Sequence, residues 1–265
     1  MSNLVEPFIS VLTPSWNRAE FLEVLISSLK NQTYKNFEWV IGNDGSIDGT
    51  NELLSKEIEN LGFPVTYVSS DLRIGKAKMD NLLLDHAKGE YLIWCDSDDH
   101  FTVNALEEVS QILVKNQINS HAGIVGVIGQ NLDTKGVSQT FSSTIAPPID
   151  GIYPWNELEK ILLGDGTICV KKSLFENQRW PEVDFLITES VLLRDLYQDN
   201  DFFLTANVLK IMDRNAENSV SFGSKMQYCR GSAYCLSAID IEERFYRLNL
   251  SARIIKVIHF FRYCI

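Results

Sequence analysis

Apolar and polar positions along the first hundred residues alternate between the period of a strand and the period of a helix. Short apolar runs, typical of buried strands, occupy 8–12, 37–41, 65–68 and 91–95. Between them, apolar residues recur every three to four positions, as on an amphipathic helix, at 21–29, 50–60 and 79–86. Gly89 follows the last of these helices and is its predicted C-cap. The order βαβαβαβ predicts parallel strands joined by right-handed crossovers.

The pattern is looser after residue 115. Strands are predicted at 121–130, 137–141, 167–170 and 208–212, and helices at 155–163 and 188–197. We therefore divide the chain into a Rossmann-like half at 1–115, a second half of the same domain at 116–225, and a helical extension at 226–265. The predicted fold class is α/β, with a doubly wound, mostly parallel sheet flanked by helices and a smaller mixed lobe.

Three polar segments directly follow strands of this predicted sheet. They are 13–18 (TPSWNR), 43–50 (NDGSIDGT) and 96–100 (DSDDH). In a parallel sheet the carboxyl ends of all strands lie at one edge, and ligands bind in the crevice there. We therefore expect the three segments to meet in space at that edge.

The length of the chain, 265 residues, suits one α/β domain with a smaller lobe.

The chain is acidic. The 24 Lys and Arg residues against 35 Asp and Glu residues give a net charge of −11, which disfavours nucleic acid as a partner. A phosphate-bearing ligand would then require backbone N–H groups, local cations or a divalent metal.

Five cysteines are dispersed without a CxxC pair, so neither disulfides nor a zinc site is predicted and a reducing compartment fits. Cys95 and Cys169 have apolar neighbours and are predicted to be buried. No signal peptide is recognised, and no run of about 18 apolar residues could span a bilayer. We expect a cytoplasmic protein. Peripheral membrane contact would come from the basic and apolar segment 253–263, for which packing against the domain is the alternative.

Asp96, Ser97, Asp98 and Asp99 come directly after the predicted strand 91–95. Three carboxylates so close together repel one another unless a cation lies among them, and hard oxygen ligands suit Mg²⁺ or Mn²⁺ shared with a diphosphate. A solvated acidic turn would have the same sequence. The position at the carboxyl end of a strand favours the metal site.

The segment Asn43-Asp44-Gly45-Ser46 is typical of a turn, because Asn, Asp and Gly tolerate positive φ. The helix predicted at 50–60 makes it a strand-to-helix turn, with Asp48 or Ser46 as the N-cap. Asp44 then remains to accept a hydrogen bond from a base N–H or a ribose hydroxyl.

Three segments together, 9–22 (ISVLTPSWNRAEFL), 28–50 (SLKNQTYKNFEWVIGNDGSIDGT) and 89–99 (GEYLIWCDSDD), resemble glycosyltransferase family 2. The members of this family are inverting enzymes of the GT-A fold. The resemblance implies a nucleoside-diphosphate sugar bound by residues 1–115, and acceptor binding and catalysis in residues 116–225. It also implies an acceptor lobe of mixed α/β structure and C-terminal helices.

The resemblance carries a set of donor-binding residues with it. These are Thr13, Pro14, Ser15, Asn17, Asp44, Gly45, Asp96 and Ser97. Asp96-Ser97-Asp98 would be the family's DxD motif, in which Asp98 binds the metal and Asp96 lies near the metal, the ribose and the diphosphate.

Between Asp71 and Asn81 the chain departs from the commonest family pattern, because Asp80 stands where many members have arginine. Gly75-Lys76 is similar to a subset of members with a Gly-Lys pair. Lys76 is therefore the expected phosphate cation, with Arg73 and Lys78 as substitutes, although surface lysines at a helix start would have the same sequence.

Family members usually carry Glu-Asp at a helix start in the second half, where the carboxylate deprotonates the acceptor. Here the carboxylate is Glu189, and Ser190 stands at the place of the aspartate. Asp165 and Asp184 are fallback candidates. The alternative is a glutamate that only stabilises the helix start.

The expected partners are a nucleotide-sugar donor and a glycan or lipid-linked acceptor, in polysaccharide or glycoconjugate synthesis. A nucleotidyltransferase would share the sheet and the metal, but segment 13–17 lacks its glycine-rich phosphate loop. A haloacid-type phosphatase would carry paired aspartates after the first strand, where none stand. A GT-A-like domain that binds a nucleotide sugar or glycan without turnover remains as a non-enzymatic alternative.

Overall fold

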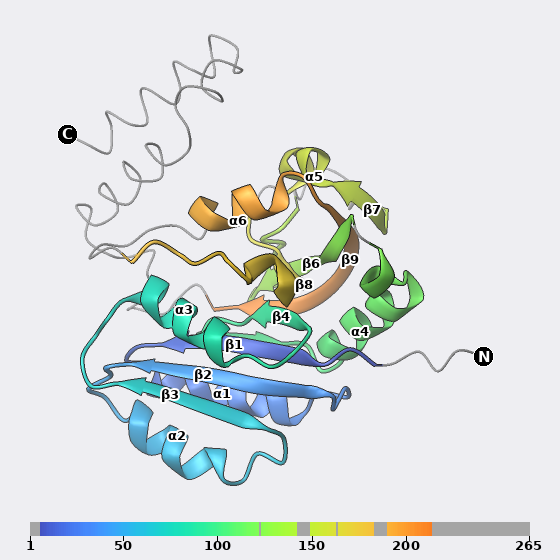
Figure 1. The fold of residues 1–265 in the computed structure, drawn as a ribbon. Coiled ribbons are helices and arrows are strands. Elements are labelled where there is room, and N and C mark those ends of the chain that lie inside the picture. The colour runs from blue at the N-terminus through green and yellow to red at the C-terminus, as the bar shows by residue number, and fades with distance from the viewer. Residues whose placement is uncertain (1–5, 122, 142–148, 163, 183–189, 214–265) are drawn as a thin grey trace, which may run out of the picture.

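The computed structural model describes residues 6–121, 123–141, 149–162, 164–182 and 190–213. Within these ranges the chain forms one nine-stranded sheet with helices on both faces (Figure 1). The strand order is β3-β2-β1-β4-β8-β6-β9-β5, and β7 pairs with β9.

The first half follows the predicted alternation of strands and helices. Its elements are β1 (Ile9–Ser15), α1 (Ala19–Lys30), β2 (Phe37–Asp44), α2 (Thr50–Ile58), β3 (Val65–Ser70), α3 (Lys76–His86) and β4 (Tyr91–Trp94). The four strands pair in parallel, which confirms the predicted βαβαβαβ unit. β1 and β2 extend three residues beyond the apolar runs, so Ser15 and Asp44 are the last residues of their strands.

The second half continues the same sheet. Its elements are β5 (Asp99–Phe101), α4 (Ala105–Lys115), a 3₁₀ turn at Ile118–Ser120, β6 (Ile124–Asp133), β7 (Gly151–Pro154), α5 (Trp155–Ile161), β8 (Thr167–Lys171), a 3₁₀ turn at Lys172–Phe175, α6 (Ser190–Tyr197) and β9 (Asp201–Met212). β8 is antiparallel to β4 and β6, whereas β9 is parallel to β6. The start of β8 and the ends of β6 and β9 therefore lie at the edge where β1, β2 and β4 end.

The predicted strand at 137–141 is wrong. This segment makes one isolated bridge, between Leu132 and Ser138. Gln139 N donates to Asn131 O of β6 at 2.9 Å, but other backbone N–H groups of the segment bond to nearby side chains. Val137 N donates to Asp133 Oδ1 and Phe141 N donates to Ser138 Oγ, at 2.9 Å and 3.0 Å. Asp and Ser side chains compete with strand pairing in this way because they reach the backbone close by.

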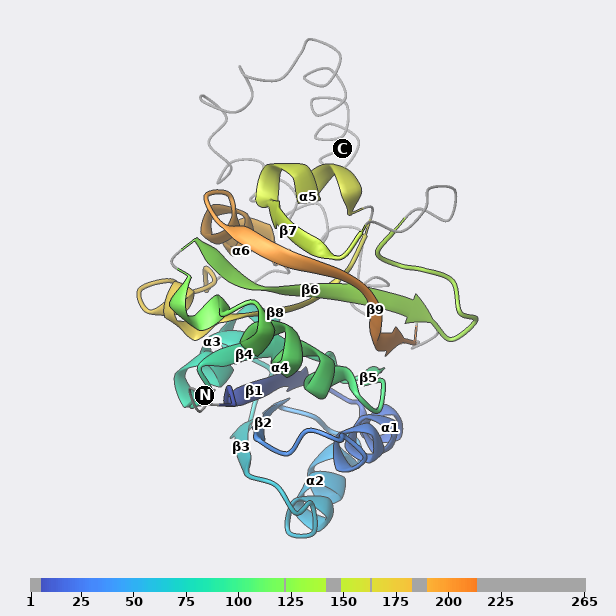
Figure 2. The ribbon, with the colours of Figure 1, turned by 90° about the vertical axis from the view of Figure 1, so that its right-hand side faces the viewer.

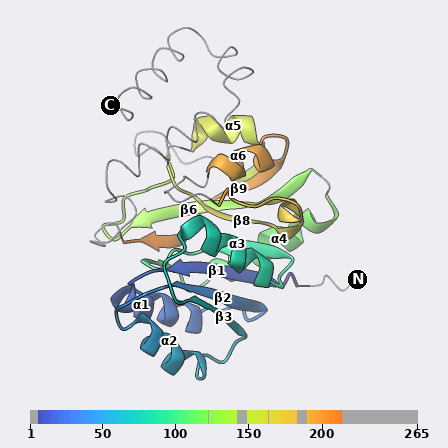
Figure 3. The ribbon, with the colours of Figure 1, turned by 60° about the vertical axis from the view of Figure 1, so that its left-hand side comes forward.

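Two hydrophobic cores cover the two faces of the sheet. Ile9, Val11, Trp39 and Ile41 face the core that α1, α2 and α4 complete, and α4 is seen at the front of Figure 2. The alternate residues face the second core, which buries side chains of α3, α5 and α6. Figure 3 shows these three helices. Cys95 and Cys169 are fully buried, as predicted.

Part of the predicted organisation lies outside the described residues, namely the extension 226–265 and the segment 253–263. The division of the chain at residues 115 and 225 stays a prediction. In the described part of the chain, no helix is both long enough and apolar enough to cross a membrane.

Gly89 is not the C-cap of α3, which was the sequence-based prediction. Ala87 occupies that position in an extended conformation, and its N–H donates to Leu83 O at 3.0 Å. Gly89 N instead donates to Ser10 Oγ of β1 at 2.8 Å. A Cβ atom at residue 89 would lie 2.5 Å from Ser10 N, so only a glycine allows the chain to pass this close to β1.

We therefore expect Gly89→Ala to lower the free energy of unfolding by about 2 kcal/mol, because the added methyl group overlaps backbone atoms that cannot move aside. Urea denaturation of the full chain measures this change. Gly123→Ala is the matched control, since a Cβ there has no neighbour within 4 Å. Equal stability of the two variants would contradict the close contact.

Candidate functional site

The loops after β1 and β2 are joined into one rim. Asn17 N donates to Ser46 Oγ and Ile47 N donates to Asn17 Oδ1, both at 2.9 Å. Asp48 Oδ2 accepts from Ala19 N at 3.1 Å. Asn17 has a φ of +51°, a left-handed conformation that asparagine tolerates. Two of the three predicted segments are therefore in direct contact.

The N-cap prediction for α2 is wrong in position. Gly49 is the N-cap, although the side chain of Asp48 still accepts a hydrogen bond from Thr50 N at 3.0 Å. Asp48 thereby serves both helices, because its second oxygen holds the start of α1. Ser46 is used for the contact with Asn17.

The predicted donor residues of β1 lie at its end and are buried. Thr13 Oγ1 accepts from Trp39 Nε1 at 3.0 Å, which fixes this hydroxyl beneath the edge. Pro14 is also buried. Ser15 Oγ is buried and has no hydrogen-bond partner among the described residues. A buried polar atom without a partner is unfavourable, so Ser15 is a position where a ligand atom would be stabilising.

Asp44 holds the start of α3. Its Oδ1 accepts from Ile74 N at 2.6 Å and its Oδ2 from Gly75 N at 3.0 Å. Gly45 has a φ of +65°, and a Cβ atom there would lie 2.5 Å from Arg73 N. From the sequence we expected the Asp44 carboxylate to accept a hydrogen bond from a ligand. The structure shows that Asp44 and Gly45 also dock the segment before α3 against the end of β2.

Lys76 is the first residue of α3 and points toward the acidic segment after β4. Its Nζ lies 2.9 Å from Asp80 Oδ2 and 3.6 Å from Asp96 Oδ1. Asp80 Oδ1 also accepts from Trp94 Nε1 at 3.2 Å. The lysine expected to be the phosphate cation is thus next to the DxD segment.

Arg73, a substitute phosphate cation in the sequence-based prediction, has another contact. Its guanidinium lies over the ring of Trp16, 3.5 Å from the centroid, which is a cation–π contact. Arg73 thereby connects the segment before α3 to the loop after β1.

The carboxylates of the acidic segment face cations from three different elements. Lys76 of α3 is near Asp96, as above. Arg18 Nη2, from the loop after β1, lies 3.7 Å from Asp98 Oδ2, and Lys210 Nζ of β9 lies 2.7 Å from Asp99 Oδ2. The third predicted segment is therefore in contact with the first, through Arg18. Ser97, which lies between Asp96 and Asp98 in sequence, is buried.

Burial and mutual repulsion shift the pKa values of these groups. Burial raises the pKa of Asp98 to about 6, with Asp96 and Asp99 acting in the same direction. Burial also raises the pKa of Asp96, but Lys76 and Lys210 outweigh it, and the pKa of Asp96 lies below its ordinary value. Burial lowers the pKa of Lys210, but Asp99 and Asp96 reverse this effect, so Lys210 is charged at neutral pH.

The donor set fits a metal that is shared with a ligand. Within the described residues, no cluster of three or more Asp, Glu, His or Cys side chains converges on one point. Mg²⁺ is often held by one or two carboxylates plus substrate phosphates. Asp98, with its neighbour Asp96, has the chemistry for this arrangement. Burial, and then the neighbouring aspartates, raise the pKa of Asp98, and a bound cation would oppose this shift.

The predicted base Glu189 and the fallback Asp184 lie outside the described residues. Asp165 is exposed and precedes β8, which starts at the same edge of the sheet as the site. Trp180 is fixed to α3, because Asn81 Nδ2 donates to Trp180 O and Trp180 N donates to Asn81 Oδ1, both at 2.9 Å.

Sequence reasoning missed Arg18 and Lys210 as partners of the aspartates. The sequence does indicate that Lys210 needs a partner, because it is the one charged residue in the apolar run 208–212. A lysine buried on a strand is rare unless it is paired. Arg18 carried no comparable signal, since a basic residue in a loop needs no partner.

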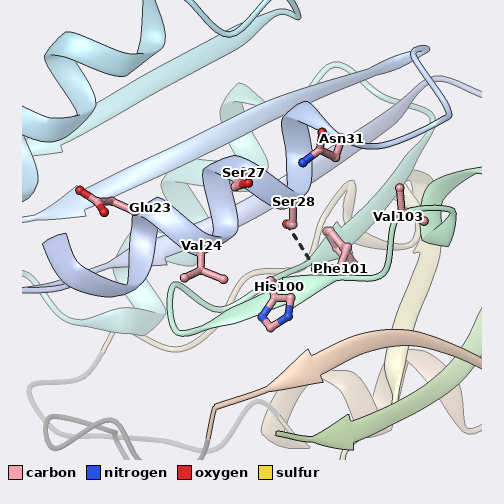
Figure 4. Close-up of a pocket in the computed structure, with 8 residues that line it drawn as sticks. All are labelled: Glu23, Val24, Ser27, Ser28, Asn31, His100, Phe101 and Val103. Atoms are coloured by element: carbon pink, nitrogen blue, oxygen red, sulfur yellow. Dashed lines mark hydrogen bonds between the residues drawn. The ribbon is translucent and has the colours of Figure 1, made fainter.

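A separate surface groove of about 590 Å³ lies along α1 (Figure 4). Val24 and Ser28 of α1 point toward His100 and Phe101 of β5, and Phe101 N donates to Ser28 Oγ at 3.4 Å. None of the predicted donor-binding residues lines this groove. The candidate site is therefore the rim formed by the three segments, not this groove.

The family model of glycosyl transferase family 2 matches residues 10–175. A Campylobacter jejuni protein, GalNAc(5)-diNAcBac-PP-undecaprenol beta-1,3-glucosyltransferase, is 28% identical over 223 residues, which cover 82% of this chain and 68% of that protein. The chain spans smaller shares, 43% and 17%, of two other curated glycosyltransferases.

Solved structures of glycosyltransferases share the fold. S. aureus TarS 1-349 in complex with UDP-GlcNAc superposes with a TM-score of 0.72 at 16% identity, over 96% of this chain and 72% of that one. A mannosyltransferase from Pyrobaculum calidifontis, in complex with GDP-Man and Mn²⁺, has a TM-score of 0.62 at 17% identity, over 88% and 64%. These likenesses confirm the predicted fold class, which is GT-A.

The buried pair of Lys210 and Asp99 gives a stability prediction. We expect Lys210→Met to lower the free energy of unfolding by about 3–5 kcal/mol, because it leaves the carboxylate of Asp99 buried without its cation. The double variant Lys210→Met/Asp99→Asn removes both charges and should recover much of the loss. Urea denaturation measures both changes, and a double variant that is less stable than Lys210→Met would contradict the pairing.

Proposed function

Because the chain belongs to glycosyl transferase family 2, we propose that it transfers a sugar from a nucleoside-diphosphate sugar to an acceptor hydroxyl, with inversion at the anomeric carbon and with Mg²⁺ or Mn²⁺. Its relatives are named glycosyltransferases, so an enzyme is favoured over a GT-A-like domain without turnover. The observation that carries the proposal is the position of Asp96 and Asp98 at the end of β4, beside Lys76 and Arg18.

The donor would bind along the rim. The nucleoside would lie by Thr13, Pro14 and Ser15 at the end of β1, near Asn17 and the turn of Asp44 and Gly45. The diphosphate would extend toward the start of α3 and the acidic segment, where Lys76 supplies positive charge. Backbone N–H groups and one cation are suited to hold phosphates in a protein with an acidic surface.

Asp98 and Asp96 would hold the divalent metal together with the diphosphate. When bound, the metal would stabilise the charge that develops on the departing diphosphate. Ser97, which lies between the two aspartates in sequence, is buried. Arg18 would hold Asp98 in place, since the side chain of Arg18 is itself buried.

Glu189 would act as the general base. It would accept the proton of the acceptor hydroxyl while the hydroxyl oxygen forms a bond to the anomeric carbon and the bond from that carbon to the diphosphate oxygen breaks. Attack from the face opposite the leaving group gives inversion. Asp165 is the fallback at the same edge of the sheet.

The acceptor would be a glycan or a lipid-linked sugar. The Campylobacter relative is named for an undecaprenol-linked substrate. A lipid-linked acceptor would require a cytoplasmic protein to work at the membrane surface, and the basic and apolar segment 253–263 is the candidate for that contact.

A donor panel tests the proposal. We expect the full chain with Mn²⁺ to release a nucleoside diphosphate slowly from one of the UDP-, GDP- or dTDP-sugars, and EDTA to stop the release. Asp98→Asn should weaken Mn²⁺-dependent binding of that diphosphate by at least ~10-fold in calorimetry, since a charged ligand contact is lost. Asp85→Asn, which alters an exposed carboxylate paired with Arg179, is the control.

Two results of this panel would contradict the proposal. Nucleotide-sugar binding with no release and no transfer would favour the non-catalytic binder. Unchanged affinity of Asp98→Asn would remove the DxD segment from the metal site.

Glu189→Gln tests the base. We expect nucleoside-diphosphate binding to stay near the wild-type value and turnover to fall by about 10²–10⁴-fold, the usual effect of removing a positioned base. Steady-state rates and calorimetry on the same preparation separate the two effects. Full turnover of Glu189→Gln would exclude it as the base, and Asp165→Asn and Asp184→Asn are then the next variants to measure.

A further inference from the structure

Asp80 is a buried carboxylate one helical turn from Lys76, and 2% of the residue is exposed. Each of its oxygens accepts from a different donor. Oδ2 lies 2.9 Å from Lys76 Nζ, and Oδ1 accepts from Trp94 Nε1 at 3.2 Å. A buried carboxylate is stable only when it is paired and hydrogen-bonded, and these two donors come from α3 and β4.

Lys76 lies between two carboxylates at different distances. The 2.9 Å separation from Asp80 is that of a charge-assisted hydrogen bond, whereas the 3.6 Å separation from Asp96 is longer than an ordinary one. The side chain of Asp96 is 44% exposed and that of Asp80 is 2% exposed. The ammonium group is therefore held by the buried carboxylate, and Asp96 is left facing the site.

Trp94 makes this arrangement rigid. It is the last residue of β4, two positions before Asp96, and its indole fixes the orientation of the Asp80 carboxylate. The end of β4 thus positions both Asp96 and Asp80, the two carboxylates that compete for Lys76.

We propose that Asp80 is a positioning residue, which holds Lys76 Nζ away from Asp96 and so keeps Asp96 available to the donor diphosphate and its metal. The inference rests on the proposed function. Without Asp80, Lys76 would move onto Asp96, because an opposite charge in a partly buried site is the most favourable partner left to it. The aspartate would then be neutralised before a donor arrives.

If only the charge of Asp80 mattered, its removal would change the affinity for a diphosphate in the opposite direction. Asp80 is a negative charge near a site for an anion, so its removal should strengthen binding of a diphosphate if nothing moves. The two views can therefore be separated by the direction of one change in affinity.

Asp80→Asn is the first test, because it keeps the shape of the side chain. Lys76 and Trp94 donate to different oxygens of Asp80. The carbonyl oxygen of asparagine can replace only one of these oxygens, and the amide nitrogen that replaces the other accepts no hydrogen bond. We expect the Kd of the nucleotide that the wild-type chain binds, UDP, GDP or dTDP, to rise about 10-fold in the presence of Mn²⁺, in line with the loss of a charged hydrogen bond. Calorimetry measures this Kd. In the Lys76→Met background, which has no ammonium group to misplace, the same Asp80→Asn change should have no further effect.

Two further variants keep the test independent of folding. Trp94→Phe removes the indole donor but keeps the Asp80 charge, and should weaken nucleotide binding in the same direction by a smaller factor. Glu57→Gln breaks the pair of Lys30 and Glu57, 2.8 Å long and on the surfaces of α1 and α2, and should leave the Kd unchanged. Thermal unfolding of each variant reports its stability separately from its affinity.

Several outcomes would overturn the inference. They are tighter or unchanged nucleotide binding by Asp80→Asn, or an equal effect of Asp80→Asn with and without the Lys76 ammonium group. If the wild-type chain binds none of UDP, GDP and dTDP with Mn²⁺, the proposed function fails and the inference fails with it. Wild-type binding combined with either of the first two outcomes would overturn the inference alone.

Discussion

Repulsion among three aspartates at the end of β4 is the constraint on which the site depends. The three residues Asp96, Asp98 and Asp99 follow a buried strand, and the carboxylates of Asp98 and Asp99 are largely removed from the water that would screen their charges. Each carboxylate is matched by a cation from another part of the chain, and these cations come from the loop after β1, from α3 and from β9. The acidic turn therefore forms in this shape only when both halves of the sheet are assembled around it.

α3 connects the parts of the site. Its start is held by Asp44 at the end of β2, and its first residue, Lys76, reaches the turn after β4. One turn later, Asp80 contacts β4 through Trp94, and the next residue, Asn81, is bonded to Trp180 in the second half. One helix thus fixes the donor side and the segment that leads toward the predicted base, so a shift of α3 would alter both together.

The periodicity of apolar residues predicted the parallel half well because three of its four strands, β1, β2 and β4, are buried on both faces. An uninterrupted apolar run such as 91–95 is typical of a buried parallel strand. Because the carboxyl ends of parallel strands lie at one edge of the sheet, the three polar segments were then predicted to meet there. Sequence reasoning failed where side chains compete for the backbone, as at Ser138, and where a glycine permits a close contact, as at Gly89. Both depend on neighbours that a local pattern does not contain.

The pairing of Arg18 and Lys210 with the aspartates could not be assigned from the sequence for the same reason. Lys210 meets Asp99 only because β9 pairs with β5, and that pairing is set by the whole second half of the sheet. An acidic protein that binds an anion has to separate the carboxylates that hold its metal from those that hold its cations. Here Asp99 and Asp80 are the buried partners of Lys210 and Lys76, while Asp96 and Asp98 are more exposed and face the rim. This division of burial, rather than the net charge of the chain, is what makes the edge of the sheet suitable for a metal and a diphosphate.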